Sequence, residues 1–223
     1  NTAILSGDQM LIEAYKQLSS VPASKLPKAL QLFNQMATEI CEGQQYDVDF
    51  EAQDHVEIAD YLMMIRLKTA VLLATALKMG AYIANADEKA QEALYQFGIN
   101  IGLAFQIQDD ILDVWGDPAT FGKAVGGDIS CNKETFVYLT ALQKANGECA
   151  QELHMWYSQV NEDNTAKIAA VKGIFEQLDV RSACEKQVDE YTTHAMELLA
   201  TLPQNAATEQ LRQLAMKLHN RKL

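Results

Sequence analysis

The chain has 223 residues, 48% of them hydrophobic, which is enough to bury one sizeable core. Its 18 basic and 30 acidic residues give a formal net charge of −12 at pH 7, which repels nucleic-acid phosphates and anionic lipid surfaces. The composition therefore disfavours non-specific binding to nucleic acid or to charged membranes. Nothing in the chain marks a second domain, so residues 1–223 are expected to form a single one.

Helical periodicity dominates the sequence, and the alternation typical of half-buried strands appears nowhere over a useful length. An all-α bundle of packed antiparallel helices is therefore expected. Pro27 suits the first turn of the second helix, which should end near Gly43, and Asp54 with Glu57 suggests a capping box before the third. About nine helices are predicted, at residues 3–18, 27–43, 56–84, 90–115, 133–145, 151–160, 165–178, 180–202 and 205–220.

The other breaks in the pattern are few. The segment from Gly116 to Lys133 contains four glycines and a proline and is the one substantial predicted loop. A more extended polar stretch is expected after Gly43, which places Asp47 and Asp49 in a loop.

Neither a membrane segment nor a secretory signal is expected. The most apolar run, residues 69–84, is interrupted by Lys78 and preceded by two basic residues, so it is too short and too charged to span a bilayer. The opening NTAILSGDQM has neither a basic region nor a cleavage site. These features predict a cytoplasmic location.

The cysteines support the same location. They lie far apart, without a spacing that suits zinc, so they are expected to be reduced and mostly buried. They are Cys41, Cys131, Cys149 and Cys184.

Three aspartates stand in an otherwise apolar helix. Asp109 and Asp113 are four positions apart, Asp110 lies between them, and Gln106 precedes Asp109 by three, so oxygen-bearing side chains crowd one side. Burying carboxylates without compensation is costly, so they should either be neutralised or hold a cation. Oxygen-only ligands favour Mg²⁺. The alternative is a solvated stripe or a helix end.

Basic residues lie near these aspartates in the sequence. Lys123 and Lys133 flank the pair Gly126 and Gly127, whose backbone amides could approach an anion closely. Lys68 follows the apolar start of the third helix. The alternatives are that the loop lysines lie on the plain surface and that Lys68 extends its ammonium to the edge of the bundle.

Four motifs together resemble the trans-type isoprenyl diphosphate synthases, which include farnesyl, geranylgeranyl and longer-chain polyprenyl synthases. The resemblance covers essentially the whole chain and implies an all-α antiparallel bundle of the isoprenoid synthase type around a central cavity. The motifs are GQQYD (43–47), RLKTAVLL (66–73), FQIQDDILD (105–113) and FGKAVGGDISCNKETF (121–136).

The resemblance implies a prenyltransferase that joins an allylic prenyl diphosphate to isopentenyl diphosphate. Roughly two or three Mg²⁺ ions would assist ionisation of the carbon–oxygen bond. Asp109 would ligate the metal directly, and Asp110 and Asp113 would ligate it or hold metal-bound water. By the same resemblance, the diphosphate would be neutralised by Lys68, Lys123 and Lys133. The ionising end of the substrate would be held by Thr69 and Gln106. The cavity wall would include Gln44 and Asp47.

One feature of the family is missing. No aspartate-rich motif precedes Asp109, although the family has two on facing helices, so this chain is expected to be an N-terminally incomplete domain that is inactive alone. A non-catalytic subunit or fragment is one alternative, and a class I terpene cyclase is another. The loop with Lys123 and Lys133, and the pair Lys68 and Thr69, favour elongation over cyclisation. The resemblance also implies a homodimer.

Overall fold

The computed structural model describes residues 1–53, 55–117, 125–159 and 163–220. Over these residues the chain is all-α. The helices are α1 (Thr2–Leu18), α2 (Leu26–Phe50), α3 (Ile58–Ile65), the π-helical segment η1 (Arg66–Ala70), α4 (Val71–Ile83), α5 (Glu88–Trp115), α7 (Gly127–Ser130), α8 (Phe136–Lys144), α9 (Gly147–Tyr157), α10 (Thr165–Gln177), α11 (Val180–Ala200) and α12 (Ala206–His219).

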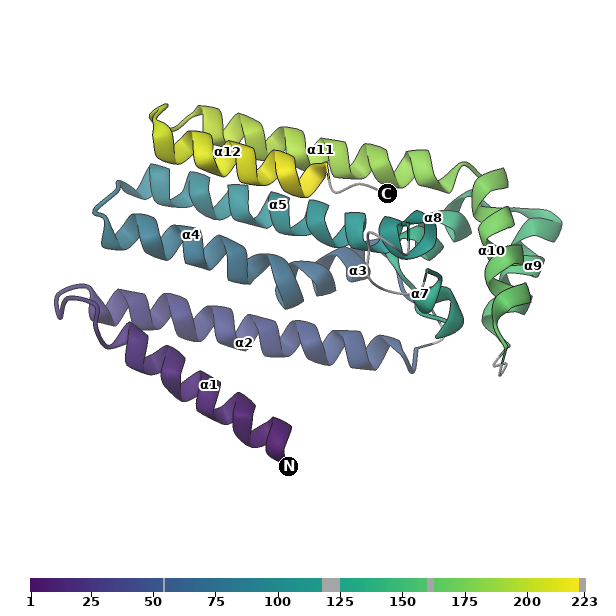
Figure 1. Cartoon of the computed structure of the whole chain (residues 1–223), viewed down its shortest axis with the longest axis horizontal. Coiled ribbons are helices and arrows are strands. Elements are labelled where there is room, and N and C mark those ends of the chain that lie inside the picture. Colours follow the sequence, from purple (N-terminus) through teal and green to yellow (C-terminus); the bar gives the residue numbers. More distant parts are fainter. Residues whose placement is uncertain (54, 118–124, 160–162, 221–223) are drawn as a thin grey trace.

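The long helices α2, α4, α5, α11 and α12 run along the length of the molecule, and α9 and α10 gather at one end (Figure 1). Helix α5 packs against α4 on one side and against α11 on the other. Helix α1 diverges from α2 toward the N-terminus (Figure 1), and of its side chains only Leu18 is buried.

All nine expected helices are present in the described parts of the chain, with three differences. The predicted third helix begins at Ile58 and is divided by η1, while Asp54 of the expected capping box lies outside the described residues. The predicted loop contains the short helix α7. The second helix continues to Phe50, so the prediction of a loop at Asp47 and Asp49 was wrong.

Gly43 explains why the second helix does not end where glycine suggested. It lies inside α2, at a close approach to η1, where an added Cβ would come within 2.3 Å of the Lys68 backbone nitrogen. Only glycine allows two backbones to approach this closely. Gly43 is therefore a packing residue rather than a helix terminator.

Two further glycines bring α5 against the preceding helical segments. A Cβ added at Gly98 would lie 2.5 Å from Ala74 Cα, and one added at Gly102 would lie 2.5 Å from Ala70 Cα. The small residues spaced four apart on α5 therefore serve close helix packing within this chain. Helix α5 carries fourteen buried residues along its length, in agreement with its apolar sequence.

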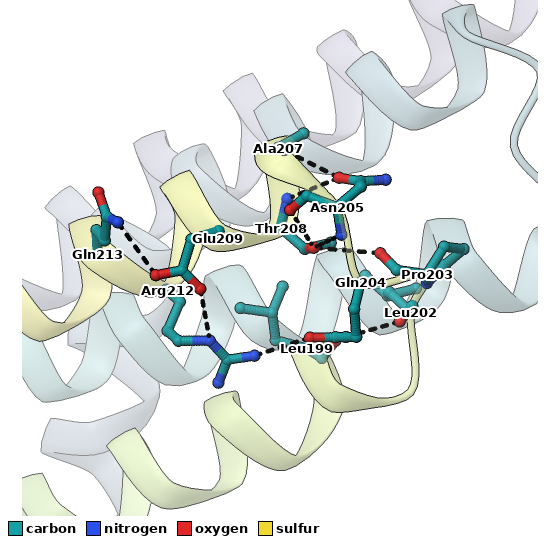
Figure 2. A network of polar contacts seen from close by, with 10 residues as sticks. All are labelled: Leu199, Leu202, Pro203, Gln204, Asn205, Ala207, Thr208, Glu209, Arg212 and Gln213. Carbon is teal, nitrogen blue, oxygen red and sulfur yellow. Dashed lines mark hydrogen bonds and ion pairs between the residues drawn. The ribbon is translucent and has the colours of Figure 1, made fainter.

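The C-terminal hairpin is held by polar contacts at its turn (Figure 2). The Asn205 side chain accepts hydrogen bonds from Ala207 N and Thr208 N, and the Thr208 hydroxyl accepts one from Asn205 N, which completes a capping box. Gln204 donates to the carbonyl of Leu199 and accepts from Arg212. These contacts fix where α12 begins and thereby its packing against α5 and α11.

The cysteines are all free, but only Cys184 is buried. The expectation that they are mostly buried was wrong for Cys41, which lies on an exposed face of α2, and for Cys131, at the end of α7. None of the helices in the described parts of the chain combines the length and apolar character that crossing a bilayer requires.

Gly102→Ala should lower the free energy of unfolding by about 1–3 kcal/mol, because the new methyl group would force α5 away from Ala70. Gly80→Ala is the matched control, since it lies in exposed helix with nothing within 4 Å of the added Cβ. That control should gain about 0.5–1 kcal/mol. Urea unfolding measures both, and equal stability of the two variants would contradict the packing argument.

Asn205→Ala should cost about 1 kcal/mol of stability, because it removes the acceptor for two amides at the start of α12. Asn146→Ala offers the comparison, since Asn146 is the N-cap of α9 but its side chain makes no capping bond. Thermal unfolding of the two variants should show a lower midpoint for the first alone.

Candidate functional site

The first part of the site joins η1 to α5. The Thr69 hydroxyl donates to the Gln106 side-chain oxygen over 3.3 Å. Asp109 follows Gln106 by three positions and is partly exposed, so both side chains project from the same side of α5. Thr69 is therefore joined to Gln106, with Asp109 one helical turn further along α5.

The second part is a cluster of two lysines on one carboxylate. Lys68 Nζ lies 2.6 Å from one carboxylate oxygen of Asp47, and Lys133 Nζ lies 3.6 Å from the other. Asp47 comes from α2, Lys68 from η1, and Lys133 from the segment before α8, so three distant parts of the chain meet here. Gln44 lies one turn earlier on α2 and is exposed.

The pKa shifts of this cluster favour the charged forms. Burial alone would raise the pKa of Asp47, but the hydrogen bond from Lys68 and the charge of Lys133 outweigh it and lower the pKa. Burial would likewise lower the pKa of Lys133, but Asp47, Asp128 and Asp110 raise it. The cluster is therefore a charged group with one more cation than anion among Asp47, Lys68 and Lys133.

Asp110 is buried in the core. Its carboxylate accepts hydrogen bonds from the Tyr61 hydroxyl over 2.7 Å and from Phe136 N over 3.1 Å, and the residue is only 5% exposed. Burial, the largest cause, raises the pKa of Asp110 to about 8, and the charge of Asp128 adds to this effect. Asp110 ties α5 to α3 and to the start of α8.

Asp113 contacts the beginning of α7. Its carboxylate accepts from Asp128 N over 3.0 Å, and its backbone carbonyl accepts from Gly126 N over 2.6 Å. Gly126 has φ +85°, which favours glycine, and a Cβ added at Gly127 would lie 3.2 Å from the Asp113 carboxylate. The two glycines thus let the backbone turn and close onto α5.

The three aspartates do not form one metal-binding group. Across the residues that the structure describes, no three His, Cys, Asp or Glu side chains gather in a way that could hold a metal ion. The physical reason is that neighbouring positions on a helix diverge by about 100°, so Asp110 faces the core when Asp109 faces the site. The oxygen donors of Asp109 and Asp113 still suit a hard cation.

Lys123 lies outside the described residues. Tyr61 and Asp128 were not predicted as site residues; the Tyr61 hydroxyl donates to Asp110 and the Asp128 backbone amide donates to Asp113. A tyrosine in an apolar run, whose hydroxyl needs a partner when buried, was the available signal for Tyr61.

The central cavity implied by the resemblance stays a prediction. A cavity of about 140 Å³ lies elsewhere, between the residues that precede α3 and helix α8. Its lining includes His55, Val56, Leu139 and Leu142.

Comparison with known proteins gives a consistent family. Residues 1–175 match the family model described as polyprenyl synthetase. The chain is 37% identical over 218 residues to the geranylfarnesyl diphosphate synthase of Natronomonas pharaonis, covering 96% of this chain and 61% of that protein. It is 32% identical to the geranylfarnesyl diphosphate synthase of Aeropyrum pernix, covering 90% of this chain and 63% of that one.

Solved structures agree in fold. A crystal structure of a geranylgeranyl pyrophosphate synthase superposes with a TM-score of 0.92 at 44% identity, covering all of this chain and 69% of that one. The Corynebacterium glutamicum geranylgeranyl pyrophosphate synthase, complexed with isoprenyl diphosphate and magnesium, gives a TM-score of 0.88 at 30% identity, covering 98% and 63%.

These matches extend over nearly all of this chain, while the chain spans 61% and 63% of the length of the two curated relatives above. The family model alone covers residues 1–175, well over half of the sequence. The all-α isoprenoid synthase fold expected from the motifs is confirmed by the structural matches. The chain belongs to the polyprenyl synthetase family.

Proposed function

We propose that the protein is a prenyltransferase that condenses an allylic prenyl diphosphate with isopentenyl diphosphate and releases diphosphate. The observation that carries this proposal is the convergence of Lys68 and Lys133 on Asp47, next to Thr69 on the same helical segment as Lys68. Paired ammonium groups suit the multiple charges of a diphosphate. The names of the relatives, which are geranylfarnesyl and geranylgeranyl diphosphate synthases, support the substrate class.

The lysines bind the allylic diphosphate in this proposal. Asp47 holds both ammonium groups in place before substrate arrives, which reduces the reorganisation that binding requires. Lys123 joins them, although it lies outside the described residues. Gln44, exposed one residue after the close contact at Gly43, lines the wall of the substrate cavity.

The ionising end of the substrate lies near Thr69, Gln106 and Asp109. Mg²⁺, when bound, would supply Lewis-acid assistance to departure of the diphosphate. Asp109 would ligate Mg²⁺ directly and Asp113 would ligate it or hold metal-bound water, while roughly two or three ions in all belong to the complete site with both aspartate-rich motifs. Asp110 serves as an anchor between α5, α3 and α8.

Carbon–carbon bond formation then follows from the substrate chemistry. The carbon–oxygen electron pair leaves with the diphosphate, the double bond of isopentenyl diphosphate attacks the allylic cation, and loss of a proton gives a product one isoprene unit longer. In this proposal the dipoles of Thr69 and Gln106, which are hydrogen-bonded to each other, stabilise the cation. Apolar helix faces around them exclude water that would otherwise quench it.

A homodimer in the cytoplasm is also part of the proposal. Helix α1 exposes apolar side chains on its surface, which supports association with another apolar surface. They include Ile4, Leu5, Leu11 and Ile12. Light scattering on the purified protein would give the mass of the assembly, and a monomer at every concentration would contradict this part of the proposal.

Product analysis tests the function directly. Purified full-length protein is incubated with Mg²⁺ and an allylic diphosphate, with and without labelled isopentenyl diphosphate, and the products are separated by chain length. Label in a longer prenyl diphosphate is the expected result. Consumption of the allylic substrate only when isopentenyl diphosphate is absent would contradict elongation. Calorimetry with Mg²⁺ and inorganic diphosphate tests the site independently of turnover.

Asp109→Asn should weaken Mg²⁺-dependent binding of inorganic diphosphate by about 100-fold or more, because it removes the carboxylate that faces the site. The fold should remain intact, since the change also relieves repulsion within α5. Asp49→Asn, an exposed position on α2, should bind as the unmodified protein does. Equal affinity in all three proteins would refute the metal assignment.

Lys68→Met should reduce affinity for inorganic diphosphate by about 10- to 100-fold, because one charge-assisted contact is lost while the apolar stem is kept. Lys78→Met is the control on the next helix, where the ammonium pairs with Glu92 at 2.7 Å instead. Calorimetry measures both affinities. If Lys68→Met changes only the unfolding midpoint, Lys68 supports the bundle and does not bind substrate.

A further inference from the structure

Helix α10 carries a lysine that is completely buried. Lys167 is 0% exposed, and its ammonium donates to the Asn132 side-chain oxygen and, over 3.2 Å, to the Gln159 carbonyl. The ammonium also lies 5.5 Å from the centre of the Tyr157 ring. Burial lowers the pKa of this group. A buried cation is costly, so its neutral partners must bind it closely.

Asn132, the first of these partners, terminates α7. Its φ of +57° is left-handed, Asn132 N donates to Ile129 O over 3.2 Å, and Lys133 N donates to Asp128 O over 2.9 Å. This pair of bonds is a Schellman motif, whose left-handed position usually holds glycine. Asparagine also tolerates this conformation, and its side chain adds bonds to Lys167 and to the Gln159 carbonyl.

The residue directly after this turn is Lys133. Its ammonium lies 3.6 Å from Asp47, although Asp47 belongs to α2 on another part of the bundle. The direction in which Lys133 leaves the turn depends on the conformation of Asn132. Among the hydrogen bonds of the described residues, Lys167 binds Asn132 and Gln159 rather than Asp47 or Lys133, so its bond to Asn132 is the contact that connects it to the turn.

We propose that Lys167 is a positioning residue, which acts through Asn132 to hold the turn that places Lys133 beside Asp47. The proposal deepens the proposed function, since it rests on Lys133 as a ligand of the allylic diphosphate. It explains why a lysine is buried in α10, away from the proposed substrate site. It also explains why asparagine stands at a position where glycine would satisfy the backbone.

Two variants test the proposal. Lys167→Met keeps the apolar stem and removes the ammonium, while Asn132→Gly keeps the left-handed backbone and removes the side chain that Lys167 binds. Lys172→Met, on a partly exposed position of α10, is the matched control. If Lys167→Met does not fold, Asn132→Gly still tests the same connection.

The first readout needs no substrate. Acetylation of Lys133 in the folded protein is followed by peptide mass spectrometry and compared with acetylation of an exposed lysine, Lys186, in the same sample. Release of Lys133 from Asp47 should increase its relative rate about three- to tenfold in both test variants, because the ion pair no longer protects the amine. An unchanged rate in the folded variants would overturn the proposal.

The second readout is affinity for inorganic diphosphate in the presence of Mg²⁺. With Lys133 present, Lys167→Met and Asn132→Gly should each bind diphosphate about fivefold more weakly than the unmodified protein. When either change is added to Lys133→Ala, the affinity should stay equal to that of Lys133→Ala alone. An equal loss in both backgrounds would overturn action through Lys133. If acetylation increases but the unmodified protein does not bind diphosphate, the positioning role stands and the proposed function fails.

Discussion

The carboxylates of α5 impose the constraint to which the surrounding structure responds. A helix buried along most of its length carries Asp109, Asp110 and Asp113, and each must be compensated differently. Asp110 receives a hydroxyl and a backbone amide in the core, where burial raises its pKa to about 8. Asp113 receives a backbone amide of α7. Asp109 is partly exposed and follows Gln106 by three positions, and in the proposed function it ligates Mg²⁺.

Compensating Asp113 has a consequence for the lysine cluster. The Asp113 carboxylate accepts a hydrogen bond from Asp128 N at the start of α7. At the end of α7, Lys167 donates to the Asn132 side chain. The short helix is thereby fixed at both ends by side chains from α5 and α10. Lys133, the next residue, then reaches Asp47 on α2. The acidic and basic halves of the site are thus connected through one turn of helix.

Much of this arrangement could be predicted from local pattern, and the rest depended on distant partners. The end of α5 at Trp115 and the shared side of Gln106 and Asp109 follow from helical periodicity. The inward direction of Asp110 does not, because it is decided by Tyr61, which lies 49 positions earlier. Gly43 was misread as a helix end because its close contact with Lys68 exists only after α2 packs on η1.

The π-helical segment η1 shows how packing and function are joined. Lys68 and Thr69 are adjacent in sequence, yet Lys68 binds Asp47 on α2 and Thr69 binds Gln106 on α5. Neighbouring residues on a helix point in different directions, so one segment placed between two helices can contact both. Gly43 from α2 and Gly102 from α5 bring those helices against the same segment, at Lys68 and Ala70. Because π-helical turns often occur at functional sites, the widened turn here is best understood as the geometry that lets one pair of residues face both halves of the site.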